Sequence, residues 1–137
     1  MNRVKYENFQ IDQQLEPIKV GPIQHMDLVR YAGASGDFNP IHTDPEFAKK
    51  VGLDGTIAHG MYVMAQVGKL LTKNFHLHQI KKFGVKFKGM TRPGEVLICT
   101  GKVKKKIDES KTILLTLEAA SENGDVKLSG EAEIACD

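Results

Sequence analysis

The sequence predicts an α+β protein in which one antiparallel sheet wraps around a central buried helix. Residues 59–73 are apolar around most of a helical circumference, so this segment has to be covered on its sides. After it the hydrophobic period changes to two, which predicts strands at 82–88, 95–107, 113–119 and 126–134. These strands are expected to form an antiparallel meander, and only the long helix can cover its apolar face.

Shorter elements are expected before the long helix. The first 22 residues suit an extended lead-in strand, which makes a sheet of about five strands in all. Residues 26–32 are compatible with a short helix, closed by the glycine and serine cluster that follows. An Asp-Pro pair then supplies the N-cap and first-turn proline of a second short helix at 45–50. A polar loop joins the two helices.

Size and composition fit a single domain that spans residues 1–137, without a linker or an internal repeat. Of the 137 residues, 41% are hydrophobic and 26% are charged, which is enough apolar material for a core. Nineteen Lys and Arg against seventeen Asp and Glu leave a formal charge of +2. This balance excludes a protein whose main partner is nucleic acid, because such a protein has to neutralise a phosphate backbone.

Neither a membrane span nor a secretion signal is expected. No window approaches the roughly 20 apolar residues of a span, and the first residues lack the apolar core of a signal peptide. Cys99 and Cys136 lie far apart and show no metal-ligand spacing, so neither a disulfide nor a cysteine zinc site is expected. We expect a soluble cytoplasmic protein with no membrane partner.

Asp37 and His42 lie five positions apart on the polar loop, which Gly36 and Pro40 stiffen. A carboxylate and an imidazole that converge on one water can orient it, take its proton and later return a proton, which is general acid-base catalysis. The alternative is structural. Short loops rich in Asp, Asn and Pro are common turns, in which Asp37 would cap the turn and His42 would be solvated.

His59 and Gly60 stand at the start of the long helix. A helix N-terminus presents unpaired N–H groups, and glycine lets a ligand approach the backbone. The Gly60 N–H can therefore stabilise the negative charge that a substrate carbonyl oxygen acquires in the transition state. Alternatively, Gly60 only relieves crowding and His59 only caps the helix. No recognised metal-ligand spacing links His59 to His42, so no metal site is expected.

Lysines alternate along two of the predicted strands. Such rows usually form the solvated face of a sheet and protect an edge from pairing. The functional alternative is a basic rim that attracts the phosphates of a coenzyme A nucleotide or the acidic face of an acyl carrier protein. The rows consist of Lys82, Lys86 and Lys88 on the first strand and Lys102, Lys104 and Lys106 on the next.

Two stretches of the chain resemble a known family. The run YAGASGDFNPIH at 31–42, followed by Phe47-Ala48, resembles the hydratase 2 motif of the MaoC-like dehydratases. The run VGLDGTIAHGM at 51–61 is similar to the continuation of that motif, above all in the (3R)-hydroxyacyl-ACP dehydratase subunits of mycobacterial type II fatty-acid synthesis. The family consists of hot-dog-fold enzymes and includes the (R)-specific enoyl-CoA hydratases.

The resemblance implies a hot-dog fold and the reversible hydration of a 2-enoyl thioester to an (R)-3-hydroxyacyl thioester in fatty-acid metabolism. It makes Asp37 and His42 the catalytic pair and Gly60 the oxyanion donor, with no cofactor and no metal. Two hot dogs usually pair with the pocket at their interface, so a homodimer is expected, with a heterodimer as the alternative. A serine of some hydratases corresponds here to Gly68, so no hydroxyl contributes from that position. The residues expected to bind substrate are Asn39, which also holds the loop, His59, Tyr62, Lys86 and Lys88.

Two other functions stay open at this point. Hot-dog thioesterases also place a carboxylate near a helix N-terminus, although His42 after Asn39-Pro40 favours a hydratase. The third interpretation is an acyl-binding subunit of a two-chain dehydratase, against which the intact Asp37 and His42 pair argues. The carrier, coenzyme A or acyl carrier protein, stays open as well, as do the chain length and the physiological direction.

Overall fold

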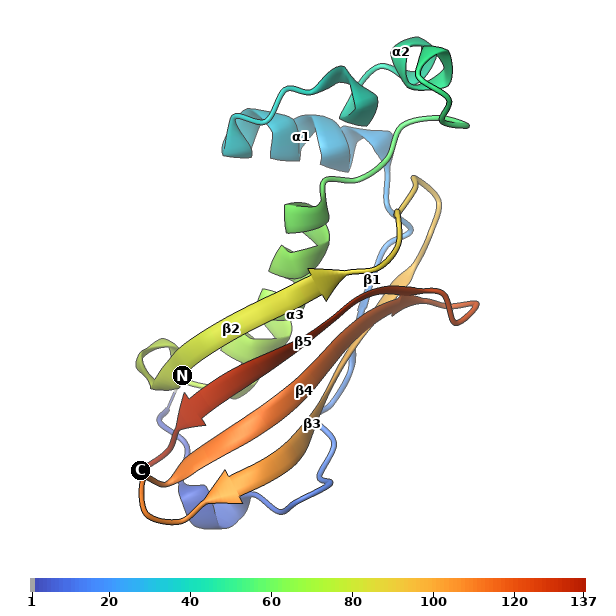
Figure 1. Ribbon diagram of the computed structural model, residues 1–137. Helices are drawn as coiled ribbons and strands as arrows, with labels where there is room; N and C mark the ends of the chain where they lie inside the picture. Colours follow the sequence, from blue (N-terminus) through green and yellow to red (C-terminus); the bar gives the residue numbers. More distant parts are fainter. Residues whose placement is uncertain (1) are drawn as a thin grey trace.

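The computed structural model describes residues 2–137 as one sheet with a long helix against it and two shorter helices beyond one end of that helix (Figure 1). The helices and strands expected after residue 22 are present within a few residues of their expected bounds, whereas the lead-in strand expected in the first 22 residues is limited to Ile18–Val20. No helix in residues 2–137 has the length and hydropathy that a membrane crossing requires. The helices are α1, His25–Ser35; α2, Pro45–Lys50; and α3, Gly60–Asn74. The strands are β1, Ile18–Val20; β2, Ile80–Phe87; β3, Leu97–Ile107; β4, Thr112–Ser121; and β5, Val126–Ala135.

The strands pair antiparallel in the order β1, β3, β4, β5, β2. The expected meander is confirmed for β3 to β5, but β2 pairs with β5 and not with β3. The expectation of a four-stranded meander in chain order is therefore wrong. Residues 88–96 connect β2 to β3, and nine extended residues reach about 30 Å, enough to cross two intervening strands. β2 lies at one edge of the sheet.

The hydrophobic core lies between the sheet and α3. The alternation predicted along β4 is confirmed, because Ile113 and Leu115 are 0% exposed and Leu117 is 3% exposed. On α3, Leu70 and Leu71 belong to the same core and are 0% and 1% exposed. Burial of one such leucine contributes about 1.5–3 kcal/mol, so α3 is held in place mainly by this face.

The opposite face of α3 is open in the single chain, contrary to the expectation of a central helix buried all round. Met61 is 54% exposed, and Gly60 and Ala65 are exposed as well. One sheet covers one side of a helix, and α1 and α2 lie beyond the N-terminal end of α3 rather than beside it (Figure 1). An apolar helical face therefore remains uncovered.

Local signals set the ends of the two short helices. The structure extends α1 three residues beyond its expected end, through Gly33, because the chain enters the left-handed region only at Gly36, where φ is 77°. The N-cap of α2 is confirmed. The Asp44 carboxylate accepts hydrogen bonds from the backbone N–H groups of Glu46 and Phe47 at 3.0 and 3.2 Å.

Candidate active site

The loop between α1 and α2 carries Asp37 and His42. Gly36 ends α1 and turns the chain into this loop. The Asn39 side chain accepts a hydrogen bond at 3.2 Å from the backbone N–H two residues further on, which starts a single 3-10 turn at Pro40–His42. Asn39 thus holds the loop in a shape that leaves the Asp37 side chain 54% exposed and the His42 side chain only 9% exposed.

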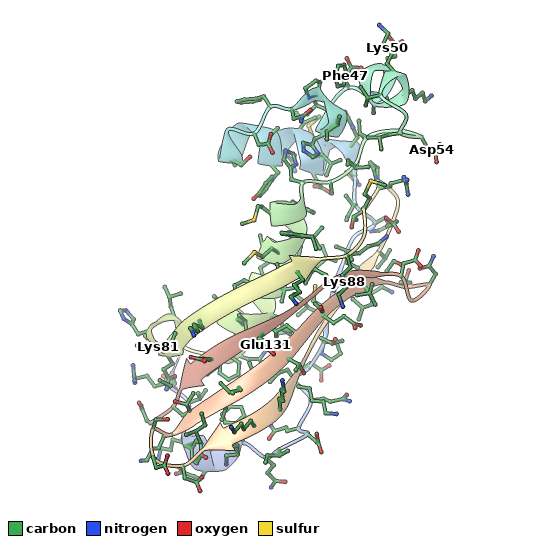
Figure 2. The ribbon with its side chains drawn as sticks, viewed as in Figure 1. Phe47, Lys50, Asp54, Lys81, Lys88 and Glu131 are labelled. Atoms are coloured by element: carbon green, nitrogen blue, oxygen red, sulfur yellow. The ribbon has the colours of Figure 1, made fainter. Side chains whose placement is uncertain are left out.

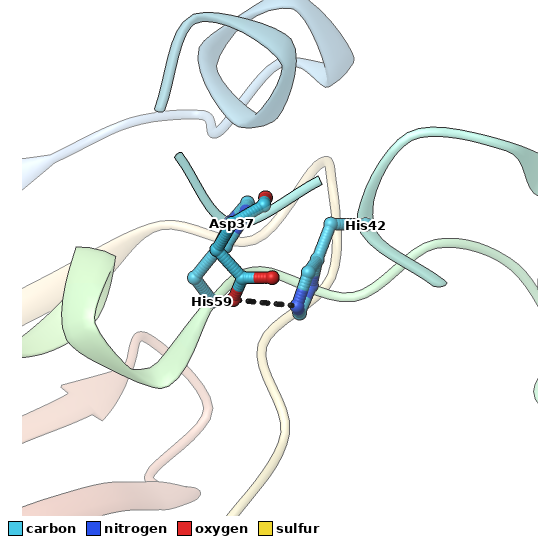
Figure 3. Close-up of side chains that lie close together, drawn as sticks. All are labelled: Asp37, His42 and His59. Atoms are coloured by element: carbon cyan, nitrogen blue, oxygen red, sulfur yellow. Dashed lines mark hydrogen bonds and ion pairs between the residues drawn. The ribbon is translucent and has the colours of Figure 1, made fainter. Parts of the chain in front are cut away.

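The His42 ring points one nitrogen at Asp37 (Figure 3). His42 Nδ1 lies 2.7 Å from the carbonyl oxygen of Ile57, which can only accept, so Nδ1 carries the proton and Nε2 carries the lone pair. Nε2 lies 3.8 Å from Asp37 Oδ2. This separation is too long for a direct hydrogen bond, but one water placed to the side of the line between the two atoms can lie about 2.8 Å from each. The two groups are placed to share a water.

His59 lies directly against this pair, although it is 22 residues from Asp37 in the sequence. Its ring stacks on the His42 ring with 3.7 Å between centroids and 21° between planes. Its Nε2 lies 3.0 Å from the main-chain oxygen of Asp37, and the Tyr31 ring meets it edge-on at 4.9 Å. His59 is 3% exposed, so little of the side chain is left to touch a substrate.

Gly60, the first residue of α3, offers a backbone donor beside this cluster. In the described part of the chain its N–H donates to no acceptor, as is usual in the first turn of a helix. An ideal Cβ at this position would lie 3.0 Å from a ring carbon of Phe87, the last residue of β2. Sequence reasoning did not connect Phe87 with the site, although the strand alternation places it on the face of β2 turned toward α3.

The cluster also raises the question of a metal ion. Asp37, His42 and His59 each offer one ligand atom, and these atoms lie within 4.8 Å of one another. The two imidazole rings are stacked and nearly parallel, however, so their lone pairs lie in parallel planes and do not converge on one point. The His59 Nε2–H is also engaged by the Asp37 carbonyl. This geometry suits an acid-base pair better than a two-histidine metal centre.

The other residues expected to bind substrate lie at different distances from the cluster. Tyr62 joins it through Tyr31, whose ring it meets edge-on at 5.6 Å, and burial raises the pKa of Tyr62. Lys86 is on the outer face of the sheet, because it alternates with Phe87 along β2. Lys88 follows the end of β2 that is nearer to α1 and α2 (Figure 2). The structure therefore brings Tyr62 to the site and leaves Lys86 outside it.

A buried ion pair supports the segment beyond β2. Lys127 is 5% exposed, and its Nζ donates to the Met90 carbonyl at 2.8 Å and to Glu95 Oε1 at 2.9 Å. The other Glu95 oxygen accepts from the Arg92 N–H at 2.7 Å. Burial opposes ionisation of Glu95, but the hydrogen bonds from Lys127 and the Arg92 N–H outweigh it and lower the pKa of this carboxyl.

This ion pair was not predicted, because alternation along residues 126–134 puts Lys127 on the solvated face. In the structure the alternation breaks at this residue. The register between β4 and β5 shifts between Ala119 and Ala120, and Lys127 is the extra residue that turns inward. The segment it supports touches the site. The Thr91 carbonyl accepts from the N–H of Ala58, the residue before His59, at 2.7 Å.

Comparison with known sequences identifies a family for most of the chain. A family model described as "MaoC like domain" matches residues 7–123. A fatty acid synthase subunit beta from Aspergillus oryzae is 35% identical over 113 residues, which are 80% of this chain and 6% of that protein. The chain thus spans a small part of the length of this relative.

Solved structures share the fold. An R-hydratase from Pseudomonas aeruginosa has a TM-score of 0.86 and 23% identity, over 98% of this chain and 86% of that one. A chain of the ChsH1-ChsH2 complex from Mycobacterium tuberculosis has a TM-score of 0.81 and 17% identity, over 93% of this chain and 98% of that one. These likenesses confirm the hot-dog fold that the sequence predicts.

Proposed function

This chain belongs to the family of MaoC-like domains, and from that premise we propose that it catalyses the reversible hydration of a 2-enoyl thioester to an (R)-3-hydroxyacyl thioester. The main support for the proposal is the spacing of 3.8 Å between Asp37 Oδ2 and His42 Nε2. The pair lies beside a helix N-terminus whose first N–H has no acceptor within residues 2–137. An acid-base pair and an oxyanion donor are the two parts that this reaction needs.

The mechanism follows from the protonation of the two side chains. The thioester carbonyl oxygen accepts a hydrogen bond from the Gly60 N–H, which stabilises the enolate-like transition state by about 2.7–4 kcal/mol. His42 Nε2 and the Asp37 carboxylate hold one water and remove its proton while its oxygen adds to the β carbon. The same pair returns a proton to the α carbon. Because one site handles both the water and the proton, addition takes place on one face of the double bond. The (R) configuration of the product is proposed from the family to which the chain belongs.

The working assembly is proposed to be a homodimer. The uncovered face of α3, where Met61 is 54% exposed, lies open together with the edge strand β2, and both can be covered by a second copy. A heterodimer with a second hot-dog subunit is the alternative, since the ChsH1-ChsH2 neighbour comes from a two-chain complex.

The carrier of the acyl group is proposed to be coenzyme A or an acyl carrier protein, both of which bear phosphate. Lys88 is exposed at the end of β2 nearer to the site and is the better candidate for such a contact, whereas Lys86 faces away from α3. Tyr62, half-buried against Tyr31, is proposed to line the acyl pocket. A cytoplasmic location stays a prediction.

The proposed function is tested by mixing the purified chain with crotonyl-CoA. We expect the enoyl absorbance to fall without release of free thiol. The variants Asp37→Asn and His42→Ala should each lower kcat at least about 100-fold, the scale of lost acid-base catalysis. Glu118→Gln, an exposed change on β4, is the matched control and should keep full activity.

Each other outcome contradicts the proposal in its own way. Release of free thiol would indicate a thioesterase. Binding of crotonyl-CoA without any turnover would indicate an acyl-binding subunit. Folded Asp37 or His42 variants with near-normal rates would remove the acid-base pair from the mechanism. Size-exclusion chromatography of the same sample tests the dimer, and a monomeric elution volume would contradict it.

A further inference from the structure

We propose that His59 is a positioning residue, which holds the main chain of Asp37 and packs against the ring of His42, so that the catalytic pair keeps the separation at which both groups can bind one water. This inference rests on the proposed function and adds a role that general acid-base catalysis does not itself require. It replaces the expectation that His59 binds substrate, because a side chain that is 3% exposed and packed between the rings of Tyr31 and His42 has little surface to offer.

Asp37 depends on His59 for its tie to the rest of the fold. Its other hydrogen bonds are local: its N–H donates to Ser35 Oγ at 3.1 Å, and its carboxylate accepts from the Asn39 N–H at 3.2 Å. Among the residues described, only His59 reaches Asp37 by a hydrogen bond from a distant segment, at 3.0 Å. The Asp37 side chain is 54% exposed, so packing alone does not fix it.

The other member of the pair is held by the same short segment. The carbonyl of Ile57 accepts from His42 Nδ1 at 2.7 Å, and the His59 ring stacks on the His42 ring at 3.7 Å. Asp37 and His42, at the two ends of the loop 37–42, are thus both held by residues 57–59. The next residue is Gly60, so one continuous stretch of backbone sets the acid-base pair relative to the oxyanion donor.

The hydrogen-bond partners also define the form of the His59 ring. The Asp37 carbonyl can only accept, so His59 Nε2 carries the proton. Within residues 2–137, His59 Nδ1 is buried and has no hydrogen-bond partner. A second proton on Nδ1 would be a buried donor without an acceptor, which is costly. The hydrogen bonds therefore place the proton of His59 on Nε2 and the proton of His42 on Nδ1.

Two variants separate the two contacts of His59. His59→Gln retains an N–H donor within reach of the Asp37 carbonyl but loses the stacked ring. His59→Phe retains a ring against His42 but loses the donor. The matched controls are His78→Gln and His78→Phe, because His78 is exposed and lies in the turn Leu77–Gln79 after α3.

If the hydrogen bond positions Asp37, His59→Phe should lower kcat for crotonyl-CoA hydration about tenfold or more, which corresponds to about 1.4 kcal/mol in the barrier. KM should change less than about threefold, and His59→Gln should restore most of kcat. Three results would overturn the inference: a raised KM with unchanged kcat, which indicates substrate binding; equal losses in both variants; or wild-type kcat in His59→Phe.

A measurement on the unaltered protein tests the hydrogen bond between His59 and Asp37, and it depends neither on activity nor on the folding of variants. Long-range nitrogen-proton NMR of protein labelled in its histidines distinguishes the two neutral ring forms. We expect the Nε2–H form for His59 and the Nδ1–H form for His42 at neutral pH. A doubly protonated or Nδ1–H form of His59 would refute the proposed contact. Absence of hydratase activity with the expected ring forms would instead refute the proposed function alone.

Discussion

Replacement of Gly60 by alanine introduces a methyl group between the start of α3 and the Phe87 ring. The new carbon would lie 3.0 and 3.1 Å from two ring carbons, whereas ordinary contact begins near 3.4 Å. Phe87 is 53% exposed and is able to move by a few tenths of an ångström. In the proposed mechanism, the methyl crowds the approach of the substrate carbonyl oxygen to the N–H of residue 60. Loss of one such donor costs at least about 2.7 kcal/mol, so we expect kcat to fall about 100-fold.

Gly68→Ala provides a matched control on the same helix. A Cβ at Gly68 would lie 3.6 Å from the Phe83 ring, which is an ordinary contact. Alanine in place of an interior helical glycine stabilises a protein by about 0.5–1 kcal/mol. We therefore expect Gly68→Ala to keep its kcat and to unfold at a slightly higher temperature, in contrast to Gly60→Ala.

Initial rates of enoyl absorbance loss, taken at saturating crotonyl-CoA, measure the effect, with thermal unfolding recorded on the same samples. Should Gly60→Ala remain within about threefold of the wild-type kcat, the helix start would not be the oxyanion site. An equal loss in Gly68→Ala would show that the effect comes from the helix as a whole and not from the Gly60 N–H.

Four further experiments test other parts of the structure. Lys127→Met removes the cation beside Glu95, so the free energy of unfolding at neutral pH, measured in urea, should fall by about 3 kcal/mol. An unchanged free energy of unfolding would show that the ion pair does not stabilise the fold. The pKa of Glu95 is lowered from 4.5 in the folded protein, so its ionised form stabilises the fold above about pH 4.5. This stability is lost as the pH falls through the folded-state pKa, and in Glu95→Gln the free energy of unfolding should depend less on pH in this acid range. Burial raises the pKa of the Cys99 thiol to about 11. A thiol reagent at mildly alkaline pH should therefore label Cys99 only after unfolding. Rapid labelling of Cys99 in the native protein would contradict its place in the core. Ala65→Arg on the open face of α3 should leave a folded monomer on size exclusion, whereas a persistent dimer would place the interface elsewhere.

Local chemistry explains which parts of the fold could be predicted. The alternation of Ile113, Leu115 and Leu117 and the cap at Asp44 depend on residues that are neighbours in the sequence. The strand order does not depend on neighbouring residues, since nothing within β2 shows that its partner is β5 rather than β3. The inward turn of Lys127 depends on a register shift between two strands and was likewise hidden from the sequence.

The candidate site divides in the same way. By itself the sequence indicated the proposed chemistry, because residues 31–42 and 51–61 resemble the hydratase 2 motif and its continuation, which contain Asp37, His42 and Gly60. Only the tertiary structure decided how these parts are held. It placed His59 behind the pair and set 3.8 Å between Asp37 and His42 Nε2. The physical reason is that a contact between residues 22 positions apart depends on how the loop packs against the start of α3, and not on the residues next to either one.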